Sequence, residues 1–158
     1  MAHAARVQQF VEDFASTLVV SGVPRMPARV FTCLLVSETG RMTAAELAGQ
    51  LQVSAAAVSG AVQYLDTVQL VRRVREPGNR REIYVVEHDV WYESMMRRDS
   101  MFQRWIDQLA DGVAVVGPGT AAGERLVESM EFFAFLTEEL EQLRSRWAER
   151  KRLRSTAS

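Results

Sequence analysis

Two helix starts in close succession constrain the fold of this chain more than any other feature. Thr43 is followed three residues later by Glu46, which is the pattern of a capping box, and Ser54 is a preferred N-cap residue. The first start predicts a helix over 43–51 and the second a helix over 55–68, with a short break between them. This arrangement is typical of a helix-turn-helix, in which the first helix braces the second.

Apolar residues at helical spacing provide the small shared core that this motif requires. They are Leu47, Ala48, Leu51, Val53, Val58, Val62 and Leu65. We expect the two helices to cross at Ala48, where a small side chain permits close packing.

The second helix of this pair would expose short side chains, namely Ser54, Ala55, Ala56, Ser59, Gly60 and Gln63. Ser and Gln can hydrogen-bond base edges in a major groove, and alanine methyl groups can contact thymine methyls. Thr43 completes the residues expected near DNA on this side. The helix carries no Arg or Lys, so direct recognition of guanine from it is not expected. Gly60 is explained either by close helix packing or by the approach of DNA.

The segment from Leu70 to Val86 changes from helical to strand periodicity. It contains two strand-forming runs joined by a Pro-Gly-Asn turn, which predicts a β-hairpin. The hairpin is rich in arginine, with Arg72, Arg73 and Arg75 on the first strand and Asn79, Arg80 and Arg81 around the tip. Such a wing can lie along phosphates and reach into a narrow minor groove.

The charge of the chain is unevenly distributed. The formal net charge is -1, so any affinity for DNA must come from a local excess of basic residues. The segment 41–86 has six Arg against four acids, whereas 87–158 has ten basic residues against thirteen acids. The local excess favours DNA binding, and the overall charge is also compatible with a winged-helix protein-interaction module in a larger assembly.

Amphipathic helices are expected on both sides of the hairpin unit. Apolar spacing predicts helices over 4–21, 28–37, 90–110 and 121–150, and a glycine-rich loop over 112–120. The last helix would be about 45 Å long at the standard rise. Its apolar seam is too long for a domain of this size to cover alone, which predicts a homodimer. The expected fold is therefore mainly α with a small β-hairpin.

Several function classes have no support in the sequence. The single cysteine and the two distant histidines exclude a disulfide and give no metal-ligand spacing. No nucleophilic or phosphate-binding motif is recognisable, so no enzyme, metal or cofactor is expected. No segment has the pattern of a secretory signal or a membrane span, which predicts a cytoplasmic protein. The near absence of lysine hints at a bacterial genome rich in G and C.

The run from Thr43 to Val86 resembles the winged-helix core of MarR-family transcriptional regulators, and specifically their GbsR-like branch. The resemblance implies a dimeric regulator that binds a pseudo-palindromic operator in double-stranded DNA, and fold-level analogy adds a repressor released by a small molecule. It assigns Ser54–Gln63 to the recognition helix, and it assigns Arg80 and Arg81 to the wing tip. Many relatives have Asp-x-Arg at this tip, whereas this sequence reads Glu-Pro-Gly-Asn-Arg-Arg over 76–81. Because the Asp is replaced or shifted, either arginine is a candidate for the minor groove.

The resemblance also divides the chain into three regions. Residues 1–27 would form an N-terminal dimerisation helix, 28–88 the winged helix-turn-helix domain, and 89–158 a C-terminal helical dimerisation region. An aromatic and Met-rich group in the third region offers candidates for an effector site, with ordinary core or dimer packing as the alternative. These candidates are Trp91, Met95, Phe102 and Trp105.

Cys33 lies among apolar residues and is expected to be buried. Some MarR relatives sense oxidants through a cysteine, but a reactive thiol needs exposure and a lowered pKa. A redox role is therefore the less favoured alternative.

Overall fold

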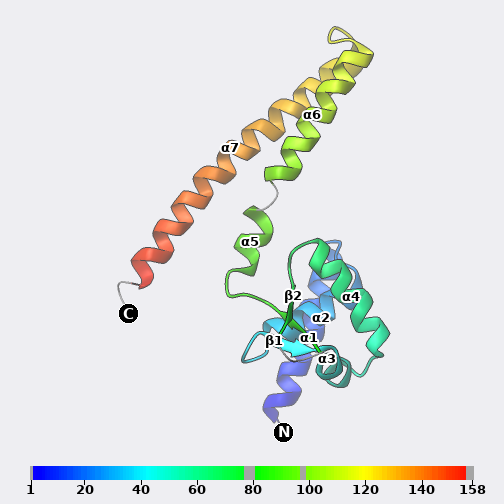
Figure 1. Cartoon of the computed structure of the whole chain (residues 1–158), viewed down its shortest axis with the longest axis vertical. Helices are drawn as coiled ribbons and strands as arrows, with labels where there is room; N and C mark the ends of the chain where they lie inside the picture. Colours follow the sequence, from blue (N-terminus) through cyan, green and yellow to red (C-terminus); the bar gives the residue numbers. More distant parts are fainter. Residues whose placement is uncertain (1, 77–80, 97–98, 156–158) are drawn as a thin grey trace. The chain divides into compact units, whose positions relative to one another are not determined.

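The structure is a computed structural model that describes residues 2–76, 81–96 and 99–155. It is mainly helical, with one small antiparallel sheet, which confirms the predicted fold class. The chain divides into two compact units, one up to Ser94 and one from Met95 onward (Figure 1). None of the helices in the described ranges is long and apolar enough to cross a membrane.

The first unit is built around α2 (Arg25–Leu35), which packs against α1 (Ala2–Val20) on one side and α4 (Ala55–Thr67) on another. Val30, Phe31 and Leu34 of α2 are fully buried. Helix α2 begins after Pro24, three residues earlier than predicted, because proline is well suited to a helix start and its missing N–H leaves no donor unpaired there.

The helix-turn-helix consists of α3 (Ala44–Leu51) and α4, and it confirms both predicted caps. The Thr43 hydroxyl accepts a hydrogen bond from the Glu46 amide while the Glu46 carboxylate accepts one from the Thr43 amide, which completes the capping box. Ser54 Oγ accepts from the Ala57 amide at 3.1 Å. Between the helices Gln52 adopts a left-handed conformation, with φ of 52°.

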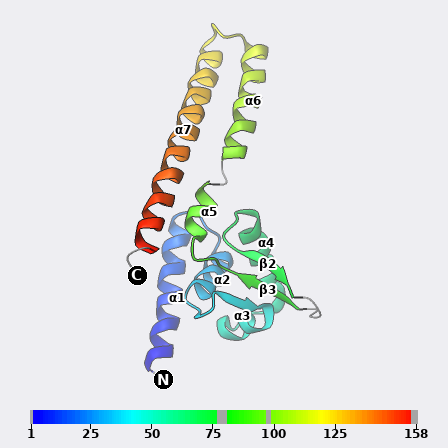
Figure 2. The ribbon, with the colours of Figure 1, turned by 60° about the vertical axis from the view of Figure 1, so that its left-hand side comes forward.

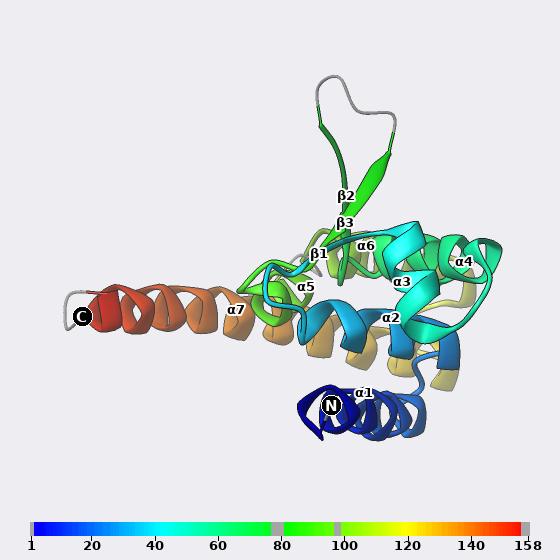
Figure 3. The same cartoon turned by 90° about the horizontal axis from the view of Figure 1, so that it is seen from below.

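The sheet has three strands in the order β1 (Arg41–Thr43), β3 (Glu82–Val85), β2 (Arg72–Arg75), all antiparallel. The predicted hairpin is β2–β3, which extends away from the helices of its unit (Figures 2 and 3). Strand β1 was not predicted. It is fixed by pairing with β3 and by Gly40, where φ is 63° and an added Cβ would lie 2.7 Å from the Val86 carbonyl oxygen.

The second unit is a helical hairpin of α6 (Asp99–Val116) and α7 (Ala121–Ser155), which lie side by side (Figures 1 and 2). The prediction of a loop over 112–120 is wrong in its first part, which is helical. The helix expected over 90–110 falls on α5 (Val90–Met96) and α6, and residues 97–98 between them lie outside the described residues. Gly112 is kept within α6 because α7 packs closely there: an added Cβ would lie 3.1 Å from the Leu126 side chain.

Candidate nucleic-acid interface

One face of α4 is exposed and the opposite face forms the core of the unit. The exposed positions are those predicted for DNA contact, namely Ser54, Ala55, Ala56, Ser59, Gly60 and Gln63. Val58, Val62 and Leu65 are fully buried on the other side. The one charged side chain of α4 is Asp66, so this face presents hydroxyl, methyl and amide groups and no cation.

Gly60 lies in open space on α4. An added Cβ would meet no atom of the described residues within 4 Å. Close packing within the chain, one of the two explanations for this glycine, is therefore wrong for this unit. The approach of a molecule from outside stays a prediction.

Thr43 is occupied in the capping box. Its hydroxyl lies 2.8 Å from Glu46 Oε2, and its amide donates to the same oxygen at 2.7 Å. Hydrogen bonds from the Thr43 amide and hydroxyl lower the pKa of Glu46, with a smaller contribution from the charge of Arg81. A contact of Thr43 with DNA therefore has to be made around a hydroxyl that is already bonded.

The arginines of β2 are all paired with carboxylates. Arg72 bonds to Glu87. Arg73 lies 3.6 Å from Asp66 of α4 and 4.0 Å from Glu82 of β3, and Arg75 lies 2.8 Å from Glu82. These side chains remain 66%, 35% and 75% exposed, and ion pairs in such positions are weak, typically below about 1 kcal/mol. A phosphate can therefore replace the carboxylate as the partner.

The tip of the hairpin is described only in part. Asn79 and Arg80 lie outside the described residues, and Arg81 is exposed just before β3. Arg41 on β1 is a further cation of this surface: it reaches Glu76 at the end of β2, at 3.3 Å. Sequence reasoning did not assign it to the site because β1 itself was not predicted.

The four candidate effector residues are divided between the two units. Trp91 lies in the first unit, 43% exposed, with its ring edge-on to Phe31 at 5.1 Å. Met95, Phe102 and Trp105 lie in the second. Trp105 also lines an open, mainly apolar pocket of about 370 Å³ together with Gln108, Leu109 and Phe133.

Cys33 is fully buried, as expected. Burial raises the pKa of its thiol to about 11, partly offset by the charge of Arg29. A buried thiol with a raised pKa has neither property that an oxidant sensor needs.

Two family models match successive parts of the chain. Residues 21–82 match a model of the MarR family, and residues 89–150 match a model described as an MmpR5-like MarR family transcriptional regulator. Both matches are to the MarR family. Together with the fold they support a MarR-family winged-helix transcriptional regulator, a DNA-binding class of protein that is generally not enzymatic.

The fold is shared with a solved structure over most of the chain. A crystal structure described as a transcriptional regulator has a TM-score of 0.82 and 20% identity, covering 91% of this chain and 99% of that one. MepR, a transcription regulator of the Staphylococcus aureus multidrug efflux pump MepA, has a TM-score of 0.40 and 14% identity. The match covers 99% of this chain and 88% of that one. A probable transcriptional regulator from Pseudomonas aeruginosa has a TM-score of 0.38 and 22% identity. The match covers 92% of this chain and 91% of that one. None of the curated proteins compared with the chain matches it.

Proposed function

We propose that this chain is a dimeric, sequence-specific DNA-binding regulator that represses transcription and is released by a small molecule. The observation that carries the proposal is the exposed face of α4, which lies on a capped helix-turn-helix next to an arginine-bearing hairpin. Because the other face of α4 is fixed in the core by Val58 and Val62, the exposed face is held rigidly enough to read a groove.

The two elements would divide the work of recognition. Gln63 and Ser59 can hydrogen-bond base edges, while Ala55 and Ala56 can contact thymine methyls. The hairpin would supply affinity through phosphates, with Arg80 or Arg81 in the minor groove. Without a cation on α4, the specificity of the helix should be modest and directed to A·T pairs.

Dimerisation would place two such units on one operator. The α6–α7 hairpin leaves Trp105, Phe132 and Phe135 between 44% and 58% exposed, and a second copy could cover them. A two-fold dimer sets its recognition helices about 34 Å apart and so requires a pseudo-palindromic site. The division into 1–27, 28–88 and 89–158 is part of this proposal.

An effector could bind the pocket beside Trp105. Its apolar walls of Trp105, Leu109 and Phe133 suit an apolar ligand, and Gln108 offers one polar group. A ligand bound there would alter the affinity for DNA by changing how two copies associate. The GbsR-like branch stays a prediction, since the model matched by the C-terminal region is MmpR5-like.

The test is binding of the purified protein to the promoter DNA beside its own gene, titrated against salt, with random DNA as the control. We expect binding that prefers the promoter and weakens steeply as salt rises, because phosphate contacts release counterions. Replacing both Arg80 and Arg81 by alanine should weaken binding to all sequences and flatten the salt dependence. Absence of binding at low salt would contradict the proposal.

A protein-interaction module is the second candidate, and one observation favours it. The β2 arginines are all paired with Asp66, Glu82 or Glu87, which reduces the positive electrostatic potential at the surface that DNA would contact. The same titration separates the two functions, and retention on heparin with a steep salt elution gives a rapid first answer. A protein partner is indicated if neither DNA nor heparin retains the chain.

A further inference from the structure

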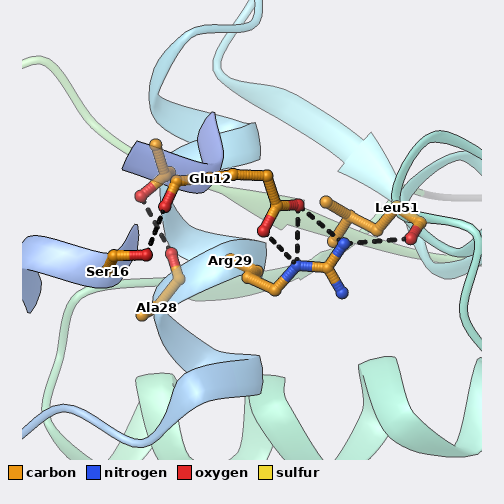
Figure 4. A network of polar contacts seen from close by, with 6 residues as sticks. Glu12, Ser16, Ala28, Arg29 and Leu51 are labelled. Carbon is orange, nitrogen blue, oxygen red and sulfur yellow. Dashed lines mark hydrogen bonds and ion pairs between the residues drawn. The ribbon is translucent and has the colours of Figure 1, made fainter. Parts of the chain in front are cut away.

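A partly buried polar network joins three helices of the first unit (Figure 4). Arg29 of α2 donates from Nε to Glu12 Oε1 and Oε2 of α1 at 2.9 and 3.1 Å, and from Nη2 to Oε1 at 2.7 Å. The same Nη2 donates to the Leu51 carbonyl oxygen of α3 at 3.2 Å. Only 17% of the Arg29 side chain and 34% of the Glu12 side chain are exposed.

The Leu51 carbonyl lies where α3 ends and the turn to α4 begins. Carbonyls in the last turn of a helix lack intrahelical donors and need other partners. The next residue, Gln52, has a φ of 52°, and the Val53 amide then closes the turn on the Ala48 carbonyl at 3.0 Å. Ser54 follows as the N-cap of α4. Arg29 therefore holds the backbone whose direction fixes how α4 starts.

We propose that Arg29 is a positioning residue for α4, and that Glu12 orients it from α1. This inference rests on the proposed function, since α4 is taken to read DNA. A guanidinium is rigid and planar, and its Nη2 bonds both Glu12 and Leu51, so the two contacts cannot change independently. A shift of α1 along α2 is thereby transmitted to the turn and to the orientation of α4.

The two roles of Arg29 can be separated by exchanging the charges. The double variant Glu12→Arg, Arg29→Glu keeps an ion pair between α1 and α2. A glutamate at position 29 can only accept hydrogen bonds, so it cannot hold the Leu51 carbonyl. The exchange should restore much of the thermal stability lost in either single variant without restoring the geometry of the turn.

Operator preference is the first readout. For Arg29→Met and for the charge-exchange variant, we expect the preference for operator over random DNA to fall by about tenfold, the loss that one weakened base contact produces. Binding to random DNA and its salt dependence should stay unchanged, because the hairpin is not altered. Asp13→Asn is the matched control: it removes a carboxylate from α1 that bonds Gln9 and leaves Arg29 alone.

Amide exchange is the second readout and needs no DNA. We expect faster hydrogen exchange at Val53 in Arg29→Met and in the charge-exchange variant than in the wild type and in Asp13→Asn. Recovery of both operator preference and Val53 protection along with stability in the exchange variant would overturn the inference. A wild type that does not prefer its operator would instead refute the proposed function, and the Val53 amide would still decide the role of Arg29.

Discussion

At the scale of single residues, Gly60 is the position on α4 that carries the clearest prediction. A methyl group there meets open space, so Gly60→Ala should stabilise the protein by about 1 kcal/mol through helix propensity. If the backbone of α4 approaches DNA at this point, the same methyl group should weaken operator binding. Urea unfolding and operator titration measure the two effects.

Gly49 provides the matched control for this substitution. It is also an exposed helical glycine, and an added Cβ there would meet no atom of the residues that the structure describes within 4 Å, but it lies on α3. Gly49→Ala should give a similar gain in stability without loss of DNA affinity. Equal operator affinity in both variants would show that α4 does not need a glycine for binding.

The thiol of Cys33 makes a second residue-scale prediction, on pH. Its folded pKa of about 11 lies above the ordinary value of 9.0, so folding favours the protonated thiol. The associated stability is present in full below pH 9.0 and is lost as pH rises towards about 11. Cys33→Ala should lose less of its unfolding free energy over that range than the wild type.

Reactivity of the thiol checks the same assignment. A disulfide reagent such as Ellman's reagent should not react with folded protein at neutral pH and should react once urea unfolds it. Rapid reaction of the folded protein would restore the redox role as a serious alternative.

Contacts of single residues could be predicted from the sequence only where the two partners lie close together in the chain. The caps at Thr43 and Ser54 act within three residues, and a local pattern is enough to recognise them. The contact between Glu12 and Arg29 joins residues 17 apart on different helices. No local pattern distinguishes this arginine from a solvated one, so the contact with Glu12 becomes evident only once α1 is packed on α2.

At the scale of elements, the basic and acidic side chains of the β2–β3 hairpin are paired, and a single substitution can alter this pairing. Glu82 lies against both Arg73 and Arg75. Glu82→Gln should release Arg75 for phosphate and remove one of the two carboxylates beside Arg73, which keeps Asp66 at 3.6 Å. The variant should bind random DNA roughly tenfold more strongly at low salt, with a steeper salt dependence. Fluorescence anisotropy with random duplex DNA measures this directly.

Glu38→Gln is the control for that change. It alters the net charge by the same amount at an exposed position before β1. We expect only a small gain in affinity, since the carboxylates bonded to the β2 arginines are those of Asp66, Glu82 and Glu87. A gain equal to that of Glu82→Gln would mean that overall charge, and not release of the hairpin, sets the affinity.

Elements were predicted where their own residues determine them. The helix-turn-helix and the hairpin have caps, apolar periodicity and turn residues that agree with one another. Strand β1 has three residues and exists through its pairing with β3, which its own sequence does not encode. The continuation of α6 past Gly112 depends on the close packing of Leu126, and a glycine read alone indicates a helix end instead.

At the scale of the whole molecule, association of two copies is the property most open to test. Phe135 of α7 is 58% exposed, and a buried charge at a dimer contact is costly. Phe135→Glu should dissociate the proposed dimer into monomers and weaken operator binding, because each half-site contact alone is weak. Sedimentation equilibrium gives the oligomeric state.

Ala148→Glu is the matched control on the same helix. It adds the same charge at an exposed position without removing an aromatic ring. It should leave the dimer intact. Dissociation by Ala148→Glu alone, or a dimer that survives Phe135→Glu, would place the contact elsewhere than at the exposed phenylalanines of α7.

The pairing of the β2 arginines with their own carboxylates also bears on how such a regulator would search a genome. Every base pair offers phosphates, so a strongly cationic hairpin would hold most copies on DNA that carries no operator. A hairpin whose charge is partly neutralised by carboxylates on and beside it leaves more copies in free solution between encounters. Occupancy of the operator would then follow the number of molecules in the cell closely, and a modest change in expression would be enough to change the output of the promoter.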